Sequence, residues 1–317
     1  LRDTWTTLSG FEELSLEAHD DRLLLWGGDE SGTLRELVPP GGTPRVVYDD
    51  ESNAPITRVT ASSTGALIVH RDGRIVQTDL DTGVERFRYT TVGAQDALWD
   101  PQLGLIVGKT RSTSFDSSVI VVDQLTGETV AANTDAFLTT QLALDPQTDT
   151  LYALGLTGSQ AAPTTTVERL RGSGFGQRSL LHESSSELSR GDLIWDRQTS
   201  SLFSSMEYGV VRRWRGRRAD ALERTQRMHT DLTVASQFVI ARNMDGTVTF
   251  WERRSGEHLV DIYVVGDEWI AIGLEGRYLA SSPRAERYLT YLPAPGTRLE
   301  MRDFRLSAPF SYPPETD

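Results

Sequence analysis

Residues 212–218 concentrate the side chains of this protein that are best suited to binding chemistry. They read Arg212-Arg213-Trp214-Arg215-Gly216-Arg217-Arg218, which places five arginines within a chain whose formal net charge is −13. A guanidinium group binds carboxylates and phosphates through paired N–H donors, and it also stacks on aromatic rings. Two interpretations are open. The arginines pair with acidic side chains of neighbouring strands, or they form a surface patch that binds an acidic partner.

Residues that often support catalysis or metal binding are present, but they lack the spacing that such sites need. Acidic runs such as Asp20-Asp21 do not form the ligand ladder of an EF-hand loop. Residues 104–110 have three residues between two glycines, where a phosphate-binding loop has four. The histidines do not pair at a metal-ligand spacing, so we expect them to make turn or core hydrogen bonds; they are His19, His70, His182, His229 and His258. We therefore expect no catalytic residue, no cofactor and no metal.

The elements that position these residues follow a frame that recurs seven times. In the clearest copy, Gly246 is followed by Trp251 five residues later and by Gly256 after five more. The starting residues are 37 to 48 positions apart, and they are Gly32, Gly73, Ser117, Thr165, Gly209, Gly246 and Glu286. A period of this size, built from short strands and turns, is typical of a β-propeller.

Each repeat contains four predicted strands. The second is a continuous apolar run, as at 66–69 and 151–154, which indicates a strand covered on both faces. The third is the framed segment, and a turn such as Asp81-Thr82-Gly83 then suits a tight hairpin that needs a positive φ. The fourth is more polar, as at 85–89, which suits an outer edge.

These observations predict an all-β fold, a seven-bladed β-propeller of four-stranded antiparallel blades formed by residues 1–306. We expect the N- and C-terminal strands to close the ring, through residues 4–8 or 299–304. Residues 307–317 contain three prolines and are predicted to be an extended C-terminal tail or linker. In this frame Arg212 and Arg213 lie in a third strand, whereas Arg217 and Arg218 lie in the turn after it.

The framed strands resemble those of WD-repeat propellers. The closest unit is 238–256, in which Asp245-Gly246-Thr247 leads into a strand that ends Trp251-Glu252. The family commonly has aspartate after this tryptophan, whereas this chain has Glu252 there and Arg215 after Trp214. The Gly-His pair that usually opens each repeat is absent, so the β-frame of the family is present without its polar signature.

A second segment, 267–289, resembles the closing repeat of large bacterial WD-repeat proteins. In those proteins an Asp-Gly-Glu-Trp stretch precedes Pro-Glu-Gly-Tyr and a serine-rich turn. Here Asp267-Glu268-Trp269 precedes Leu274-Glu275-Gly276-Arg277-Tyr278 and two serines, 281 and 282. The resemblance implies a bacterial multidomain or envelope protein whose propeller binds other macromolecules, and it does not imply an enzyme.

Composition excludes several classes of partner. The charge of −13 argues against general nucleic-acid binding and against docking on anionic membranes. The chain has no cysteine, which excludes disulfides and thiolate metal sites. No apolar stretch approaches the roughly 18 residues of a membrane span, so we expect no direct membrane insertion. A cytoplasmic location is favoured over a periplasmic or lipid-anchored one because no export signal is visible.

We therefore predict a non-catalytic protein–protein interaction scaffold or binding module, with protein partners of open identity. The candidate partner-binding patch consists of Arg212, Arg213, Trp214, Arg215, Arg217 and Arg218. The alternative is a propeller enzyme, such as a hydrolase or lyase, or a small-ligand sensor, with its site in the central channel.

Overall fold

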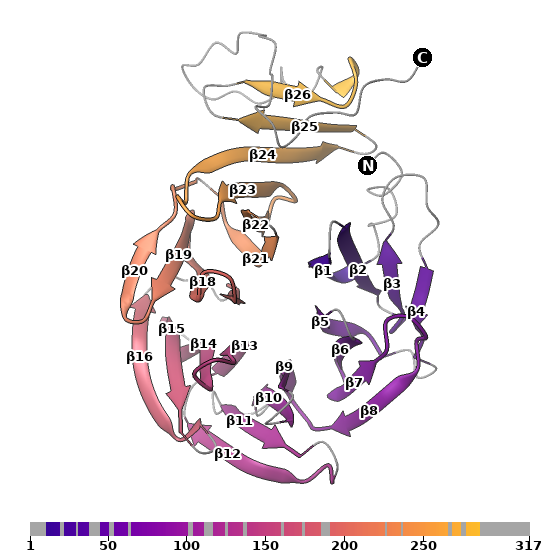
Figure 1. Cartoon of the computed structure of the whole chain (residues 1–317), viewed down its shortest axis with the longest axis vertical. Helices are drawn as coiled ribbons and strands as arrows, with labels where there is room; N and C mark the ends of the chain where they lie inside the picture. Colours follow the sequence, from indigo (N-terminus) through magenta and orange to yellow (C-terminus); the bar gives the residue numbers. More distant parts are fainter. Residues whose placement is uncertain are drawn as a thin grey trace.

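The computed structural model describes a chain of antiparallel β-strands that form six sheets arranged in a ring (Figure 1). The described residues are 11–19, 22–29, 31–37, 45–50, 54–62, 65–100, 104–110, 117–123, 126–135, 138–159, 162–172, 175–184, 191–225, 227–235, 237–265, 268–273 and 277–285. Within these residues, no helix is both long enough and apolar enough to cross a membrane.

Strands follow one another in each sheet in chain order. Sheet one contains β1 (Phe11–His19), β2 (Arg22–Asp29), β3 (Leu34–Leu37) and β4 (Arg45–Tyr48). Sheet two contains β5 (Ile56–Ser62), β6 (Gly65–His70), β7 (Arg74–Thr78) and β8 (Glu85–Thr90). Sheet three contains β9 (Ala94–Asp100), β10 (Gly104–Thr110), β11 (Ser117–Val122) and β12 (Thr129–Asp135).

The second half of the chain continues the pattern and then departs from it. Sheet four contains β13 (Leu138–Asp145), β14 (Thr150–Ser159), β15 (Ala162–Arg171) and β16 (Gln177–Ser184). Sheet five contains β17 (Leu193–Asp196), β18 (Ser201–Glu207), β19 (Val210–Arg215) and β20 (Arg218–Ala221). Sheet six contains β21 (His229–Ala235), β22 (Phe238–Asn243), β23 (Val248–Glu252), β24 (His258–Val265), β25 (Glu268–Gly273) and β26 (Tyr278–Ala280).

The first strand of each sheet lies at the centre of the ring. Going round the ring, β1 contacts β5, β5 contacts β9, and the contacts continue through β13 and β17 to β21, which contacts β1. The fourth strands lie outside. This arrangement is that of a β-propeller, in which each sheet is a blade that covers the faces of its neighbours.

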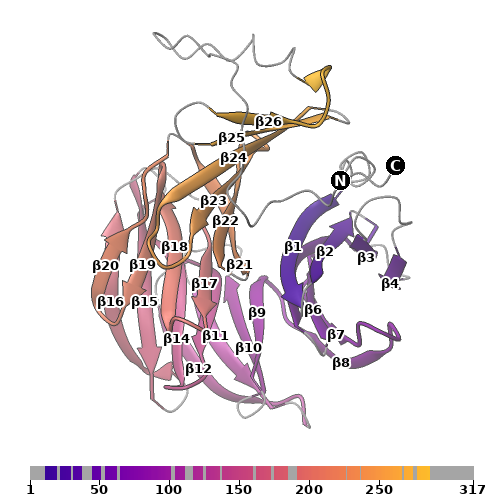
Figure 2. The same ribbon diagram turned by 45° about the horizontal axis from the view of Figure 1, so that its top comes forward.

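The predicted count of seven four-stranded blades is wrong for the described residues, which form five four-stranded blades and one six-stranded sheet. In the repeat frame, residues 268–280 precede the seventh copy, at Glu286, and would supply the first two strands of a seventh blade. Instead β25 pairs with β24 from Val260↔Gly273 to Val265↔Glu268, and β26 pairs with β25. Figure 2 shows both strands stacked beyond β24, outside the ring. The predicted closing strands, 4–8 and 299–304, and the tail 307–317 lie outside the described residues.

The hydrophobic core lies between consecutive sheets, as the apolar second strands predicted. On β14, Leu151 packs against sheet three together with Ile106 and Val121, while its neighbour Tyr152 packs against sheet five. Leu151 is 0% exposed and Tyr152 is 5% exposed. A strand with both alternating faces buried reads as a continuous apolar run, which is why these strands could be predicted.

The hairpin turns after the third strands also follow the prediction. Gly83 has a φ of 71° and Gly127 a φ of 69°, and the backbone N–H of each donates to the carbonyl oxygen four residues earlier. A Cβ atom added at Gly83 would lie 2.2 Å from the carbonyl oxygen of Val47. Glycine is needed there both for its φ and for the close approach of sheet one.

Candidate functional site: an arginine-rich surface

The arginine-rich segment forms the β19–β20 hairpin of sheet five. Arg215 pairs with Arg218 across the hairpin, and Gly216 and Arg217 form the turn between them. Gly216 has a φ of 65°. The predicted placement of Arg212 and Arg213 in the strand and of Arg217 in the turn is confirmed, whereas Arg218 begins β20.

Two members of the predicted patch are buried and bind the protein itself. The Trp214 ring is 4% exposed, packs between sheets four and five, and donates from Nε1 to Ser204 Oγ at 2.9 Å. The Arg213 side chain is 7% exposed and donates from Nη1 to the carbonyl oxygens of Arg253 at 3.0 Å and Arg254 at 2.7 Å. Arg213 thus donates to backbone carbonyls of the neighbouring sheet six. The first interpretation of the sequence instead pairs the arginines with acidic side chains of neighbouring strands. Burial, and then the charge of Arg215, lowers the pKa of Arg213.

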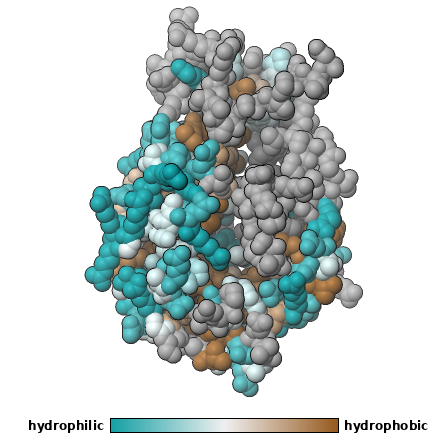
Figure 3. All heavy atoms as spheres, in the orientation of Figure 1, coloured by the Kyte–Doolittle hydropathy of each residue, from teal (hydrophilic) through white to brown (hydrophobic). Residues whose placement is uncertain are grey.

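The other members lie at the surface. Arg212 is half-buried, and Arg215, Arg217 and Arg218 are exposed. Arg218 Nε lies 3.3 Å from Asp220 Oδ1, but its side chain remains 83% exposed, so this ion pair contributes little to stability. Figure 3 shows hydrophilic side chains along the left edge of the molecule, over β16, β19 and β20. The structure therefore divides the predicted patch into a buried support and an exposed group.

Topology brings further arginines to the same end of the ring. Neighbouring strands run in opposite directions, so the first and third turns of every blade lie at one end. Arg171 lies at the end of β15 just before such a turn, and Arg254 lies in the β23–β24 turn. Both are exposed. We call the exposed set Arg171, Arg215, Arg217, Arg218 and Arg254 the arginine surface.

The repeat frame contains the signal for the residues that sequence reasoning missed. Leu170 and Trp214 occupy the same position of two successive repeats. Arg169 and Arg171 flank Leu170 as Arg213 and Arg215 flank Trp214. Aligning the two copies would have extended the patch from sheet five to sheet four.

A second charged group crosses the centre of the ring. Arg58 on β5 forms ion pairs with Asp96 on β9 (Nε–Oδ1, 3.5 Å) and with Asp192 just before β17 (Nη2–Oδ1, 3.2 Å). The backbone N–H groups of Leu142 and Leu232 each donate to one of these carboxylates at 2.7 Å, Leu142 to Asp96 and Leu232 to Asp192. The carboxylates thus join sheet three to sheet four and sheet five to sheet six. Burial raises the pKa of both, and that of Asp192 reaches about 6.

This central group was also missed, although the sequence contains a signal for it. Residues 96–100 and 192–196 share the pattern Asp-x-Leu/Ile-Trp-Asp. Arg58 lies in sheet two and Asp192 in sheet five, 134 positions apart, and only the closed ring places them in contact.

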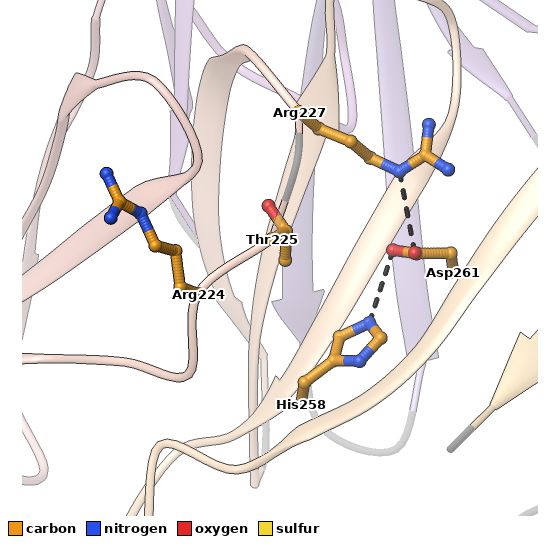
Figure 4. A pocket seen from close by; sticks show the side chains of 5 residues that line it. All are labelled: Arg224, Thr225, Arg227, His258 and Asp261. Carbon is orange, nitrogen blue, oxygen red and sulfur yellow. Dashed lines mark hydrogen bonds and ion pairs between the residues drawn. The ribbon is translucent and has the colours of Figure 1, made fainter. Parts of the chain in front are cut away.

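A pocket of about 280 Å³ lies between β24 and the segment that follows β20, and it is lined by Arg224, Thr225, Arg227, His258 and Asp261. Asp261 lies 3.4 Å from Arg227 and 3.3 Å from His258. In Figure 4 the Arg224 side chain points away from this group. Burial would raise the pKa of Asp261, but hydrogen bonds from His258 and Thr249 outweigh burial and lower it. Most of the charges that line the pocket are therefore already paired within the protein.

Two of the histidines take the expected core role. His70 Nδ1 lies 2.9 Å from the carbonyl oxygen of Ala54, and His229 Nδ1 lies 2.6 Å from Asn243 Oδ1. Burial lowers the pKa of both, which favours neutral rings. Across the described residues, no three His, Cys, Asp or Glu side chains gather in a way that could hold a metal ion.

Comparison with known proteins adds the fold class. No protein-family model and no curated protein sequence matches the chain. The β-propeller domain of Cps50 (Swd1) from Myceliophteria thermophila matches with a TM-score of 0.59 and 13% identity, over 86% of this chain and 97% of that one.

Two further solved structures are similar. A chain of the mitotic checkpoint complex matches with a TM-score of 0.57 and 11% identity, over 79% of this chain and 83% of that chain. The computationally designed protein Ika8 matches with a TM-score of 0.51 and 15% identity, over 86% of this chain and 97% of its own. At these identities the similarity establishes the fold alone: the chain is an all-β propeller built from antiparallel sheets.

Proposed function

We propose that this propeller is a non-catalytic protein-interaction scaffold that binds an acidic protein segment on its arginine surface. The observation that carries the proposal is the gathering of exposed guanidinium groups from three neighbouring sheets in a chain of charge −13. Arginine is enriched at interface hot spots because its planar group makes several hydrogen bonds at once. A rigid ring also presents its turns with little loss of entropy on binding.

The buried members of the patch support this role by fixing the hairpin. Arg213 ties β19 to the β23–β24 turn, and Trp214 anchors the opposite face of the strand to β18. Arg215 and Arg217 are therefore held on a fixed support, and within the described residues no carboxylate forms an ion pair with either. A partner carboxylate would complete their hydrogen bonding.

The neighbouring structures are consistent with a scaffold. One similar propeller is part of an assembly named the mitotic checkpoint complex. The alternative, a catalytic or small-ligand site in the central channel, would have to accommodate the ion pairs of Arg58 with Asp96 and Asp192. No specific observation favours that alternative over a surface role.

We also propose that the chain is a bacterial WD-repeat-like propeller, on the strength of segment 267–289 and of the strand frame around Trp251. Its partners would be proteins rather than nucleic acids or membranes, as the charge of −13 suggests. A cytoplasmic location remains part of the proposal.

The test is a charge reversal on the hairpin, Arg217→Glu/Arg218→Glu. Proteins retained by the immobilised wild type are identified, and the affinity of the leading partner is then measured for wild type and variant. We expect the variant to lose about tenfold or more in affinity, equivalent to about 1.4 kcal/mol, because two attractive charges become repulsive.

The matched control is Arg86→Glu/Arg88→Glu on β8, which makes the same change of charge at side chains that are 50% and 47% exposed. We expect it to bind nearly as well as wild type. Equal affinities of the hairpin variant and the wild type, with both chains folded, would overturn the proposal.

A further inference from the structure

Three arginines lie on sheets four and five where these two sheets face each other. Arg169 and Arg171 lie two residues apart on β15 and so point to the same face. Arg169 pairs with Tyr152, whose ring stacks on Trp195 of sheet five at 5.5 Å, so this face is turned toward sheet five. Arg217 approaches from the β19–β20 turn of that sheet. Arg171, at the end of the third strand of sheet four, and Arg217, in the third turn of sheet five, lie at the same end of neighbouring blades. Burial lowers the pKa of Arg169, and the charges of Arg171 and Arg217 add to this effect.

In two of these arginines the Nε–H group donates a hydrogen bond to a hydroxyl oxygen. Arg169 Nε donates to Ser179 Oγ at 3.2 Å, and Arg171 Nε donates to Thr150 Oγ1 at 2.9 Å. A guanidinium group has five N–H donors, of which four are on its two Nη atoms. Each of these arginines is thus fixed through Nε, and no acceptor among the described residues takes up its Nη groups.

On the opposite face of the β15–β16 hairpin, an arginine is paired with a carboxylate. Glu168, next to Arg169 in sequence, points the opposite way and forms an ion pair with Arg178. The arginine on one face of the β15–β16 hairpin is thus paired with a carboxylate, whereas Arg169 and Arg171 on the other face, and Arg217 of sheet five, form no ion pair with a carboxylate of the described residues.

We propose that Arg169, Arg171 and Arg217 form a binding site for a doubly charged oxyanion, namely the phosphate group of a phosphorylated side chain. Guanidinium forks match the oxygens of phosphate in a bidentate manner, and a phosphate monoester carries about −1.5 to −2 charges at pH 7. A single carboxylate carries only one negative charge and two oxygens, so it could not match the three positive charges and the N–H donors of three arginines. The inference rests on the proposed function, because the phosphate would belong to the acidic segment of the partner.

Binding of inorganic phosphate tests the site without knowledge of the partner. Titration calorimetry on the whole chain should show saturable binding, and sulfate should compete for it. Arg217→Gln lies in an exposed turn and is expected to weaken binding about tenfold, the effect of losing one hydrogen-bonded charge. Arg169→Lys keeps the charge but loses the fork, and it should weaken binding as well. Arg86→Gln on β8, which is exposed and lies outside the arginine surface, should bind phosphate like wild type.

Two model peptides then distinguish the source of the oxyanion. A short peptide with one phosphoserine should bind more tightly than inorganic phosphate, and the same peptide with glutamate in that position should bind at least about tenfold more weakly. Tighter binding of free phosphate than of the phosphopeptide would overturn the assignment to a phosphorylated side chain. An absence of saturable phosphate binding, or equal binding by wild type, Arg217→Gln and Arg169→Lys, would overturn the site itself.

The two proposals can fail separately. If Arg217→Glu/Arg218→Glu abolishes partner binding while phosphate does not bind, the scaffold proposal stands and the phosphate site is wrong. If phosphate binds and Arg217→Gln loses it, while partner affinity is unchanged by the charge reversal, the phosphate site stands and the scaffold proposal is wrong.

Discussion

Arginine side chains with the same chemistry have different roles in this propeller, and the environment of each decides its role. Arg213 is buried and caps two backbone carbonyls, whereas Arg58 lies between two aspartates at the centre of the ring. Arg217 is exposed in a turn. A sequence can reveal that arginines are concentrated in one place, but it cannot reveal which of them the fold will use internally.

Asp192 gives a prediction about pH. Burial raises its pKa to about 6, and the nearby charges of Asp231 and Asp96 add to the effect. Aspartate in an unfolded chain has a pKa of about 3.9, so the folded chain holds this proton more tightly. The stabilisation from this group is therefore fully present below about pH 4 and is lost as the pH rises through about 6.

The substitution Asp192→Asn removes this titration. We expect the unfolding free energy of the variant, relative to wild type, to improve as the pH rises from about 4 to about 7. Urea unfolding at several pH values measures the difference. A difference that does not vary with pH would contradict the assignment of the raised pKa to Asp192.

Single elements of the fold follow closely from the residues that form them. The apolar run 151–154 predicted a strand buried on both faces, and β14 is such a strand, with Leu151 facing sheet three and Tyr152 facing sheet five. The glycine of the Asp81-Thr82-Gly83 turn predicted a positive φ, which Gly83 has. These features depend on local sequence alone, so one repeat is enough to predict them.

The burial of β14 predicts the effect of truncating its side chains. Leu151→Ala removes a fully buried side chain between two sheets, and we expect it to lower the unfolding free energy by about 2–5 kcal/mol. The control is Val84→Ala, because Val84 is 61% exposed and should change stability by about 0.5 kcal/mol or less. Urea unfolding of both variants measures these effects, and similar values for the two would show that sheets three and four are not packed as described.

Contacts between distant repeats could not be predicted in the same way. The repeat frame identified a propeller, yet it predicted seven four-stranded blades where the described residues form five and a six-stranded sheet. Whether β25 starts a new blade or pairs with β24 depends on tertiary packing, which the local pattern of residues 268–273 does not encode. The same holds for the contact of Arg58 with Asp192 and for the placement of Arg171 and Arg217 at the same end of neighbouring blades, since each depends on which blades become neighbours.

The whole molecule is a ring with two ends, and the arginine surface lies at one of them. The turns that carry Arg171, Arg217 and Arg254 lie at one end, and the β18–β19 turn with the exposed Tyr208 lies at the other. We call the end that carries the arginine surface the arginine end. If an acidic segment binds there, the position of the partner on the ring can be predicted, and affinity measurements alone do not reveal that position. The partner must lie against that end of sheets four to six.

Site-specific photocrosslinking shows which end of the ring the partner occupies. A photoreactive benzoylphenylalanine is placed at Arg197, exposed in the β17–β18 turn at the arginine end, or at Tyr208, which is 54% exposed at the opposite end of the same sheet. Partner captured by the chain is then irradiated and the crosslinked peptides are sequenced. We predict crosslinks from position 197 to an acidic segment of the partner and none from position 208. Crosslinks from position 208 alone would place the partner at the opposite end of the ring and would overturn the proposed scaffold function of the arginine surface.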